Sequence, residues 1–371
     1  MGLEALLGGD RDQLAVERAI AEFRAGRPVL VESAQGCVLA APAEGLDSAA
    51  LAALEGLAGG AARLVLSAAR LRRLGVRERG PGAVALPDVD IARLARLALA
   101  EIAAIDAAVL PLLRAEDMAL RLAHLAALLP ALVTVPVADD ALAGVAIARV
   151  EADAVGAYRA RRAAALHIVA RAKVPLDGAP ESEFVIFRGG EGLRDQAAVI
   201  VGDPDRAEPV AVRLHSACLT GDLFGSLKCD CGDQLRMTAR YLAENGGGII
   251  LYLDQEGRGN GLASKIKAYR LQADGFDTFD ADEVLGFDED QRAFDFAAEM
   301  LKQLGVSRVR ILTNNPVKSD ALQAAGLEVV AEQRVIGRQT PQNAGYLAAK
   351  RLKAGHSIDD ETAAARAAEK G

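Results

Sequence analysis

Three of the chain's four cysteines lie close together as a C-x10-C-x-C set formed by Cys218, Cys229 and Cys231. A clustered thiol set in a cysteine-poor protein indicates a metal site or redox chemistry. Thiolates are soft ligands that suit tetrahedral zinc, and three protein ligands plus a water form the open arrangement of a catalytic site. Short cysteine motifs also arise by chance. A cluster of buried thiols, or a closed zinc site completed by His215, therefore stays open as an alternative.

A glycine-rich run, 255–261, follows directly on an apolar stretch, 249–253, that is typical of a buried strand. Glycines after a strand let the backbone approach a ligand closely, and the start of a following helix favours phosphate. Arg258 could then hold a phosphate, and Glu256 could accept hydrogen bonds from a base. The run matches neither the dinucleotide fingerprint nor a P-loop, so an ordinary βα turn with solvated charges is an equal alternative.

The chain is acidic overall, with a formal net charge of −8 and a sequence pI of about 5.3. This balance argues against a nucleic-acid binder or an anionic-membrane binder. An anionic ligand must therefore be held by a local basic cluster. The candidates for such a cluster are Arg213, Arg258, Lys265, Arg292 and Lys318. Taken singly, each is explained as a solvated charge, so a binding role requires that folding bring them together.

Asp290 and Tyr269 have structural explanations that spacing alone does not exclude. Asp290 stands at the expected start of a helix, 290–304, where a carboxylate caps the helix and matches its dipole. Tyr269 falls on an apolar helical stripe with Leu262 and Ile266, which is typical of a core tyrosine with a satisfied hydroxyl.

Length and composition indicate two soluble domains in the cytoplasm. The 371 residues suit two domains, and 51% hydrophobic residues are ample for two cores. The first ten residues lack the features of a signal peptide, and the most apolar segment, 102–113, is too short to span a bilayer. Free thiols without a secretion signal are typical of the reducing cytoplasm.

The pattern of elements predicts an α/β fold with a domain boundary between residues 172 and 173. A helix over 13–25 precedes short strands at 29–32 and 37–41, and Ala-rich helical segments follow. Punctuation by Pro175, Gly178 and Pro180 marks the boundary. The second half alternates strand and helix, which indicates a layered α/β domain. A charged, Ala-rich tail over 357–371 has no packing face.

Five motifs in the second half, taken in order, resemble GTP cyclohydrolase II, the enzyme that begins riboflavin synthesis from GTP. They are HSACLTGDLFGSLKCDCG, QEGRGNGL, KIKAY, DTFDADEVLGFDEDQR and LTNNPVK. The resemblance covers residues 173–356. It implies a zinc-dependent hydrolase with one Zn²⁺ per chain, Mg²⁺ with the triphosphate and a homodimeric assembly.

The resemblance also assigns roles to residues. Zinc would be held by Cys218, Cys229 and Cys231. The family's proton acceptor falls on Asp290 and its proposed nucleophile on Arg292, although an arginine with a pKa above ~12 is an unusual nucleophile and Arg292 could instead stabilise phosphate charge. Tyr269 matches the tyrosine linked to opening of the purine's five-membered ring. The nucleotide-contacting positions fall on Arg213, Leu214, His215, Ser216, Ala217, Gln234, Glu256, Gly257, Arg258, Thr278, Thr313 and Lys318.

The implied reaction converts GTP to 2,5-diamino-6-(5-phosphoribosylamino)pyrimidin-4(3H)-one, formate and pyrophosphate. Zinc lowers the pKa of a bound water, and positive charge assists pyrophosphate departure. Two alternatives remain: a paralogue that stops at a formamidopyrimidine nucleotide or acts in pyrimidine catabolism, and a nucleotide-binding regulatory protein without turnover. Ala217, Asp254 and Asn260 depart from the family pattern and bear on the nucleotide contacts.

The first domain, 1–172, resembles 3,4-dihydroxy-2-butanone 4-phosphate synthase over Ala19 to Val31. In that synthase an acidic loop follows and binds magnesium. Here the corresponding residues, 32–37, contain one carboxylate, Glu32, and the family's Arg-x-Gly-His-Thr motif is missing. A site without its metal carboxylates cannot stabilise the enediolate of ribulose 5-phosphate. We therefore expect a degenerate domain kept for folding, dimer contacts or regulation.

Overall fold

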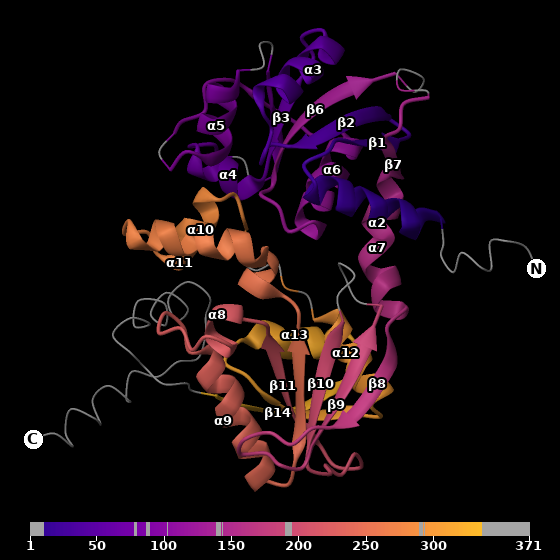
Figure 1. The fold of residues 1–371 in the computed structure, drawn as a ribbon, viewed down its shortest axis with the longest axis vertical. Helices are drawn as coiled ribbons and strands as arrows, with labels where there is room; N and C mark the ends of the chain where they lie inside the picture. The colour runs from indigo at the N-terminus through magenta and orange to yellow at the C-terminus, as the bar shows by residue number, and fades with distance from the viewer. Residues whose placement is uncertain are drawn as a thin grey trace, which may run out of the picture. The chain divides into compact units, whose positions relative to one another are not determined.

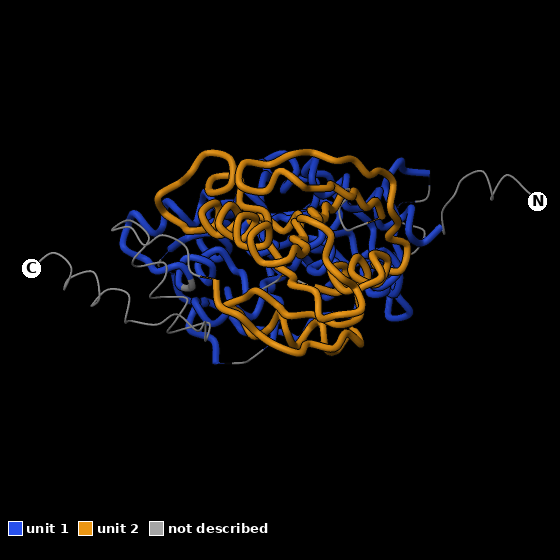
Figure 2. Tube along the Cα trace, turned by 90° about the horizontal axis from the view of Figure 1, so that it is seen from below, with its two compact units in different colours: residues 1–162, 257–291 blue, residues 163–256, 292–371 orange. Residues whose placement is uncertain are grey.

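The computed structural model describes residues 11–77, 80–86, 90–101, 103–138, 142, 144–189, 195–288, 292 and 294–335. The chain divides into two compact units (Figure 2). Unit 1 comprises Met1–Arg162 and Gly257–Gln291, and unit 2 comprises Ala163–Glu256 and Arg292–Gly371. Each unit holds its own seven-stranded sheet and helices (Figure 1), which confirms the predicted two-domain α/β class.

The sheet of unit 1 has the strand order β5-β4-β3-β6-β2-β1-β7. Only β1 and β7 pair in parallel; the other described pairs are antiparallel. The predicted hairpin about Gly36 is confirmed, because β1 pairs with β2 in the register Ser33 to Gly36. The strands are β1 (Val29–Ser33), β2 (Gly36–Pro42), β3 (Arg63–Leu66), β4 (Gly82–Ala85), β5 (Val109–Leu110), β6 (Ala131–Val137) and β7 (Ala148–Glu151).

Successive side chains of each strand point to opposite faces of this sheet and join two different apolar clusters. Helices therefore cover both faces. Val29 and Val31 pack with α2, α6 and α7, whereas Leu30 packs with α3, α4 and α5. Helix α6 contributes seven buried residues to this unit and lies inside its apolar core. The helices are α2 (Arg11–Arg24), α3 (Ser48–Ala58), α4 (Ala68–Arg73), α5 (Ile91–Leu99), α6 (Arg114–Leu125) and α7 (Ala152–Ala164).

Residues 257–291 belong to unit 1 although they lie far along the chain from its other residues. We call them the α10–α11 segment; it contains most of the 3₁₀ turn η2 (Glu256–Gly259) and the helices α10 (Gly261–Ala273) and α11 (Thr278–Val284). The expected apolar stripe of α10 is not its buried face, since Leu262 and Ile266 are exposed and Tyr269 is half-buried. The helix buries small residues instead, Ser264 and Ala268, together with Leu271.

The sheet of unit 2 has the order β14-β13-β11-β12-β10-β9-β8. It is parallel from β14 to β12 and antiparallel from β12 to β8. Its strand β8 begins before residue 173, so the sheet starts upstream of the expected boundary. The strands are β8 (His167–Lys173), β9 (Ser182–Arg188), β10 (Gln196–Val201), β11 (Val210–Ser216), β12 (Gly248–Leu253), β13 (Arg308–Leu312) and β14 (Glu328–Gln333).

The central strand β11 sends its side chains to two different layers. Val212 and Leu214 join the apolar cluster that contains α12, whereas Ala211 joins the cluster that contains α9. The odd-numbered Arg213 and His215 therefore share the α9 side, and Ser216 shares the α12 side. The helices are α8 (Leu219–Asp222), α9 (Cys231–Glu244), α12 (Asp295–Gln303) and α13 (Pro316–Ala324).

Two further expectations need comment. The helix predicted over 290–304 is shorter: α12 begins at Asp295, and Arg292 stands before its N-cap residue, Phe294. No helix in the described part of the chain combines the length and apolar character that a bilayer crossing requires. Residue Asp290 and the tail over 357–371 lie outside the described residues.

Candidate active site

The three clustered cysteines converge after the carboxyl end of β11. Cys218 is the N-cap of α8, and Cys231 is the first residue of α9. The three sulfur atoms all lie within 4.8 Å of one another, and the Sγ atoms of Cys218 and Cys229 are 3.6 Å apart. Sulfurs around a tetrahedral zinc with Zn–S bonds of ~2.3 Å are separated by about 3.8 Å. The donor set and its spacing therefore fit a zinc ion.

Two glycines make room for this arrangement. A Cβ atom on Gly221 would lie 2.8 Å from the Cys229 sulfur and 3.0 Å from the Cys218 sulfur. A Cβ atom on Gly232 would lie 2.1 Å from the carbonyl oxygen of Gly221. Any side chain at either position would push the α8 and α9 ends apart, so the glycines permit the close approach of the thiols.

His215 does not complete the cysteine cluster. Among the described residues, the group that could hold a metal contains the three cysteines alone. The His215 Nε2 atom lies 3.1 Å from each carboxylate oxygen of Asp222. An ionised carboxylate only accepts hydrogen bonds, so Nε2 carries the proton and donates. The closed site with His215 as fourth ligand does not fit this arrangement, whereas an open three-cysteine site does.

Asp222 connects three groups around the cluster. Besides His215, its Oδ2 atom accepts from the Cys218 backbone N–H at 2.9 Å and from the Tyr252 hydroxyl at 3.0 Å. Tyr252 is the register partner of His215 on β12, and the two rings stack with centroids 5.6 Å apart. Burial raises the pKa of Tyr252, so its hydroxyl remains a donor. Asp222 therefore fixes both the imidazole and the start of α8.

The sequence interpretation missed Asp222 and Tyr252 as site residues. The available sequence signal was the position of Asp222 four residues after Cys218, whereas Tyr252 is placed beside His215 by the pairing of β12 with β11 in the folded sheet. Burial lowers the pKa of His215, and the Asp222 hydrogen bond opposes this shift. The Nδ1 atom is buried and has no hydrogen-bond partner among the described residues.

Arg213 is a buried cation held by polar partners from α9 and β13. Its Nη1 donates to the Leu312 carbonyl at 3.0 Å, and its Nη2 donates to Gln234 Oε1. Gln234 in turn donates to Asp230. Burial lowers the pKa of Arg213 to about 10, which leaves the guanidinium charged at neutral pH. Its Nε has no partner in the described part of the chain.

Two further cations gather on the other side of β11, around Phe294. The Lys318 ammonium lies 5.6 Å from the centre of the Phe294 ring, and the Arg292 guanidinium lies 5.7 Å from it. Lys318 also donates to the Leu214 carbonyl, and Arg292 Nη1 approaches Ser216 Oγ at 3.5 Å. Cation–π contacts with the Phe294 ring therefore stabilise both cations.

The remaining residues of unit 2 that are predicted to contact the nucleotide form hydrogen bonds with backbone groups. Glu256 is buried and accepts from the Leu219 N–H at 2.6 Å, and the Ala217 N–H donates to Leu253 at 2.8 Å. Thr313 Oγ1 accepts from the Asn315 N–H at 3.0 Å, at the start of α13. This places Thr313 at the turn that presents Lys318.

The other predicted residues lie in unit 1. Gly257 and Arg258 both have φ of 61°, which is the left-handed region that a non-glycine residue rarely adopts. The strain at Arg258 is held by an ion pair to Asp282 at 2.5 Å and a weak contact to the Thr278 carbonyl at 3.4 Å. Backbone strain of this kind clusters at functional sites.

Tyr269 is half-buried on α10, and the Lys265 ammonium lies 5.8 Å from its ring centre. The core-tyrosine explanation fails, since the neighbouring Leu262 and Ile266 are exposed. The candidate cations thus fall in two groups: Arg213, Arg292 and Lys318 in unit 2, and Arg258 with Lys265 in unit 1.

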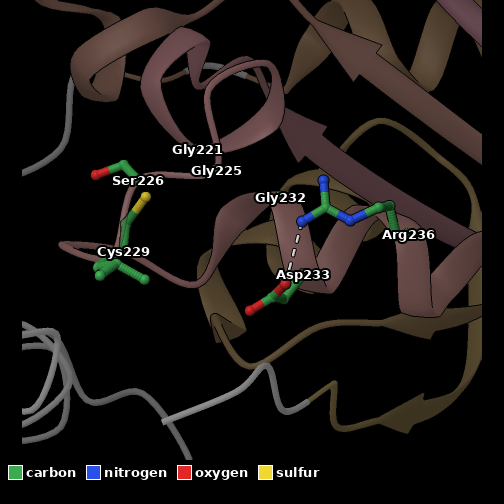
Figure 3. Close-up of a pocket in the computed structure, with 8 residues that line it drawn as sticks. Gly221, Gly225, Ser226, Cys229, Gly232, Asp233 and Arg236 are labelled. Atoms are coloured by element: carbon green, nitrogen blue, oxygen red, sulfur yellow. Dashed lines mark hydrogen bonds and ion pairs between the residues drawn. The ribbon is translucent and has the colours of Figure 1, made fainter. Parts of the chain in front are cut away.

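A pocket borders the cysteine cluster in unit 2 (Figure 3). Its cavity volume is about 110 Å³. Cys229 and Gly221 line it on one side, and Asp233 with Arg236 lines it on the other, where the two side chains form an ion pair at 3.1 Å. Solvent and small solutes can therefore reach Cys229.

Comparison with known proteins identifies the family. The family model of GTP cyclohydrolase II matches residues 167–334. A GTP cyclohydrolase-2 from Azospirillum brasilense is 41% identical over 381 residues, covering 95% of this chain and 96% of that protein. One from Xylella fastidiosa strain Temecula1 is 41% identical over 354 residues, with 95% and 89% covered. One from Klebsiella pneumoniae is 45% identical over 198 residues, which is 53% of this chain and 97% of that protein.

A solved two-domain 3,4-dihydroxy-2-butanone 4-phosphate synthase from A. baumannii covers 87% of this chain with 15% identity and a TM-score of 0.34, a likeness too weak to support an argument about the first domain. The matches to GTP cyclohydrolase-2 from Azospirillum and Xylella, by contrast, extend over nearly the whole sequence. This protein is a member of the GTP cyclohydrolase II family.

Proposed function

We propose that the protein catalyses the zinc-dependent hydrolysis of GTP to formate, pyrophosphate and 2,5-diamino-6-(5-phosphoribosylamino)pyrimidin-4(3H)-one, the first step of riboflavin biosynthesis. The observation that carries this proposal is the convergence of three thiols, with sulfurs within 4.8 Å, at the end of a strand that also bears buried Arg213 and His215. Family membership supplies the reaction class.

Cys218, Cys229 and Cys231 would hold the zinc ion. When bound, it supplies a Lewis acid and an activated water for hydrolysis at C8 of the purine. The chain's own part is to fix the three thiolates: Gly221 and Gly232 allow the close approach, and Asp222 anchors the Cys218 N–H.

His215 would act on protons beside this centre. Its Nε2–H is committed to Asp222, so the buried Nδ1 lone pair is directed to accept a proton or a hydrogen bond from the nucleotide or a water. The low pKa that burial gives the imidazole keeps that lone pair available at neutral pH.

Lys318, Arg292 and Arg213 would supply positive charge to the triphosphate, together with Mg²⁺. Burial strengthens the attraction between these cations and the phosphates, because water and salt screen a buried charge less. Removal of pyrophosphate develops negative charge on the leaving group, which fixed cations stabilise. In unit 1, Arg258, Gly257 and Thr278 would contact the nucleotide, and Tyr269 would donate a proton as the five-membered ring opens. We retain Asp290 as the proton acceptor on the family resemblance.

The test is direct. Purified protein with GTP and Mg²⁺ should release formate and pyrophosphate together, and mass spectrometry should detect the diaminopyrimidine product. Stripping the zinc with a chelator should abolish formate release, and added Zn²⁺ should restore it. Formate release without zinc, or accumulation of a formamidopyrimidine nucleotide as the only product, would contradict the proposal.

We further propose that the protein is a cytoplasmic homodimer and that residues 1–172 have no synthase activity. Light scattering after size-exclusion chromatography would check the dimer, and a monomer of about 39 kDa would contradict it.

A further inference from the structure

The α10–α11 segment has a small apolar core of its own. Ala268, Leu271, Ala281 and Val284 form a cluster with Phe276 and Leu285, separate from the two clusters that surround the sheet of unit 1. So few side chains bury little apolar surface, and burial is the main driving force for packing. Contacts with the rest of unit 1 must therefore fix where the segment lies.

Arg70 makes the most deeply buried of these contacts. Its guanidinium is 1% exposed and donates from Nη1 to the Val284 carbonyl of α11 at 2.9 Å. Its other donors reach the carbonyls of Leu97 at 2.7 Å and Ala100 at 2.8 Å, at the end of α5. Burial lowers the pKa of Arg70 to about 10. One side chain thus joins the last carbonyls of two helices, which otherwise lack intrahelical donors.

Both ends of the segment approach the rest of unit 1 so closely that glycine is required. Ser67 donates to the carbonyl of Gly286, and a Cβ atom at Gly286 would lie 3.2 Å from Ser67 Oγ. At the other end, a Cβ atom on Gly261 would lie 2.9 Å from the Ala127 Cβ. Gly261 and Gly286 have φ of 85° and 82°, which also favours glycine.

Exposed charges surround these buried contacts. Arg72 pairs with Glu283 at 3.0 Å and with Asp288 at 3.3 Å, and Lys267 pairs with Glu44. The Arg73 guanidinium lies 5.4 Å from the centre of the Phe276 ring. Helix α4 and its N-cap therefore contribute four residues that contact the segment, namely Ser67, Arg70, Arg72 and Arg73.

We propose that α4 is a positioning element for the α10–α11 segment, with Arg70 as its central positioning residue. The first domain would then serve the cyclohydrolase reaction by holding the segment that carries Arg258, Tyr269 and Thr278. The predicted effect of α4 on turnover rests on the proposed function. The effect of α4 on the position and rigidity of the α10–α11 segment is independent of the reaction.

The experiment compares Arg70→Met, Arg70→Lys and Arg162→Met in the full-length protein. Arg162 is also a buried arginine of unit 1, but it pairs with Glu17 at 3.1 Å, away from the segment. Hydrogen exchange measured by mass spectrometry should show faster exchange of residues 261–285 in Arg70→Met than in Arg162→Met. Arg70→Lys, which keeps a donor, should give an intermediate rate.

Steady-state kinetics provide the second measurement. Arg70→Met should raise KM for GTP or lower kcat/KM by about 10- to 100-fold, because misplaced binding groups lose effective orientation. Its zinc content should stay equal to that of the parent, since the cysteines lie in unit 2. Equal exchange rates in Arg70→Met and Arg162→Met would overturn the proposal. Faster exchange with unchanged kinetics would leave the segment positioned by α4 but refute its importance for turnover.

A surface pair keeps the test decisive if Arg70→Met does not fold. Arg72→Glu places a carboxylate beside Glu283 and Asp288, and the repulsion should increase exchange in 278–285. The double variant Arg72→Glu with Glu283→Arg should bring the exchange back toward that of the parent. Absence of both the increase and the recovery would count against α4 as the positioning element. If the parent protein does not turn over GTP, the exchange measurements decide this inference while the proposed function fails.

Discussion

His215 donates from Nε2 to the carboxylate of Asp222, with both oxygens at 3.1 Å, and its Nδ1 has no partner among the described residues. A histidine held in one tautomer by a carboxylate presents its second nitrogen as an acceptor. Asp222 also accepts from the Cys218 N–H, so one carboxylate orients the imidazole and the first cysteine of the metal site.

Asp222→Asn should lower kcat/KM by about 10- to 100-fold, the usual effect of removing a group that orients a site. The amide has one acceptor oxygen and so cannot serve His215, Cys218 and Tyr252 together. Nitrogen-15 NMR of the imidazole should show that His215 no longer occupies a single tautomer. Asp177→Asn, which alters an exposed ion pair with Arg240, is the control and should leave both signals unchanged. A parent-like tautomer and rate in Asp222→Asn would show that Asp222 does not orient the site.

Cys229→Ser should lose bound zinc and reduce formate release by more than about 100-fold, since a hydroxyl is a poor replacement for a thiolate ligand. Metal analysis and a formate assay measure the two effects. Cys37→Ser is the matched control, because Cys37 is buried in unit 1 and belongs to an apolar cluster. Full zinc content in Cys229→Ser would rule out a site made of these three thiols.

Lys318→Met should raise KM for GTP by about 10- to 100-fold, because a charged hydrogen bond to phosphate is worth ~1.5–3 kcal/mol. Methionine keeps the length of the buried side chain and its packing near Phe294. Lys302→Met, an exposed lysine in the last turn of α12, should leave KM unchanged. The KM for GTP should become less sensitive to salt in Lys318→Met than in the parent. An unaltered KM would remove Lys318 from the nucleotide site.

Tyr269→Phe should consume GTP but release formate more slowly, on the order of 100-fold, because the proton donor for ring opening is lost. Mass spectrometry should detect a nucleotide that retains the formyl carbon. Tyr241→Phe removes a hydroxyl that bonds Gln333 at 3.0 Å and serves as the control. An unchanged product mixture in Tyr269→Phe would contradict the assigned role.

Incubation with ribulose 5-phosphate should give no dihydroxybutanone phosphate at any Mg²⁺ concentration. Deprotonation beside the ketone needs a metal and a base together, and Glu32 is already paired with Arg149 at 2.9 Å. Synthase activity that copurifies with the protein through successive columns would contradict this expectation. Loss of such activity in Glu32→Gln would identify the domain as its source.

The sequence alone determined the cysteine set, the family and most of the regular elements. Local signals are sufficient for these: three thiols in one short stretch define a donor set, and apolar periodicity defines α9, β12 and the hairpin at Gly36. The alternation of side chains along β11 also follows from strand geometry, once the strand is placed.

The tertiary structure decided the partners of these residues. Tyr252 lies beside His215 only because β11 and β12 pair in a particular register, which no local pattern encodes, and Asp222 at the end of α8 bonds to both side chains. Helix α10 buries Ser264 and Ala268 in place of its larger apolar residues, and Gly261 lies against Ala127, because small residues permit close approach. The placement of 257–291 in unit 1 likewise depends on contacts between residues more than 200 positions apart, such as Arg70 with Val284. Hydrogen bonds to backbone carbonyls carry these contacts, and every residue offers the same carbonyl group, so the sequence gives no signal for which carbonyl is chosen.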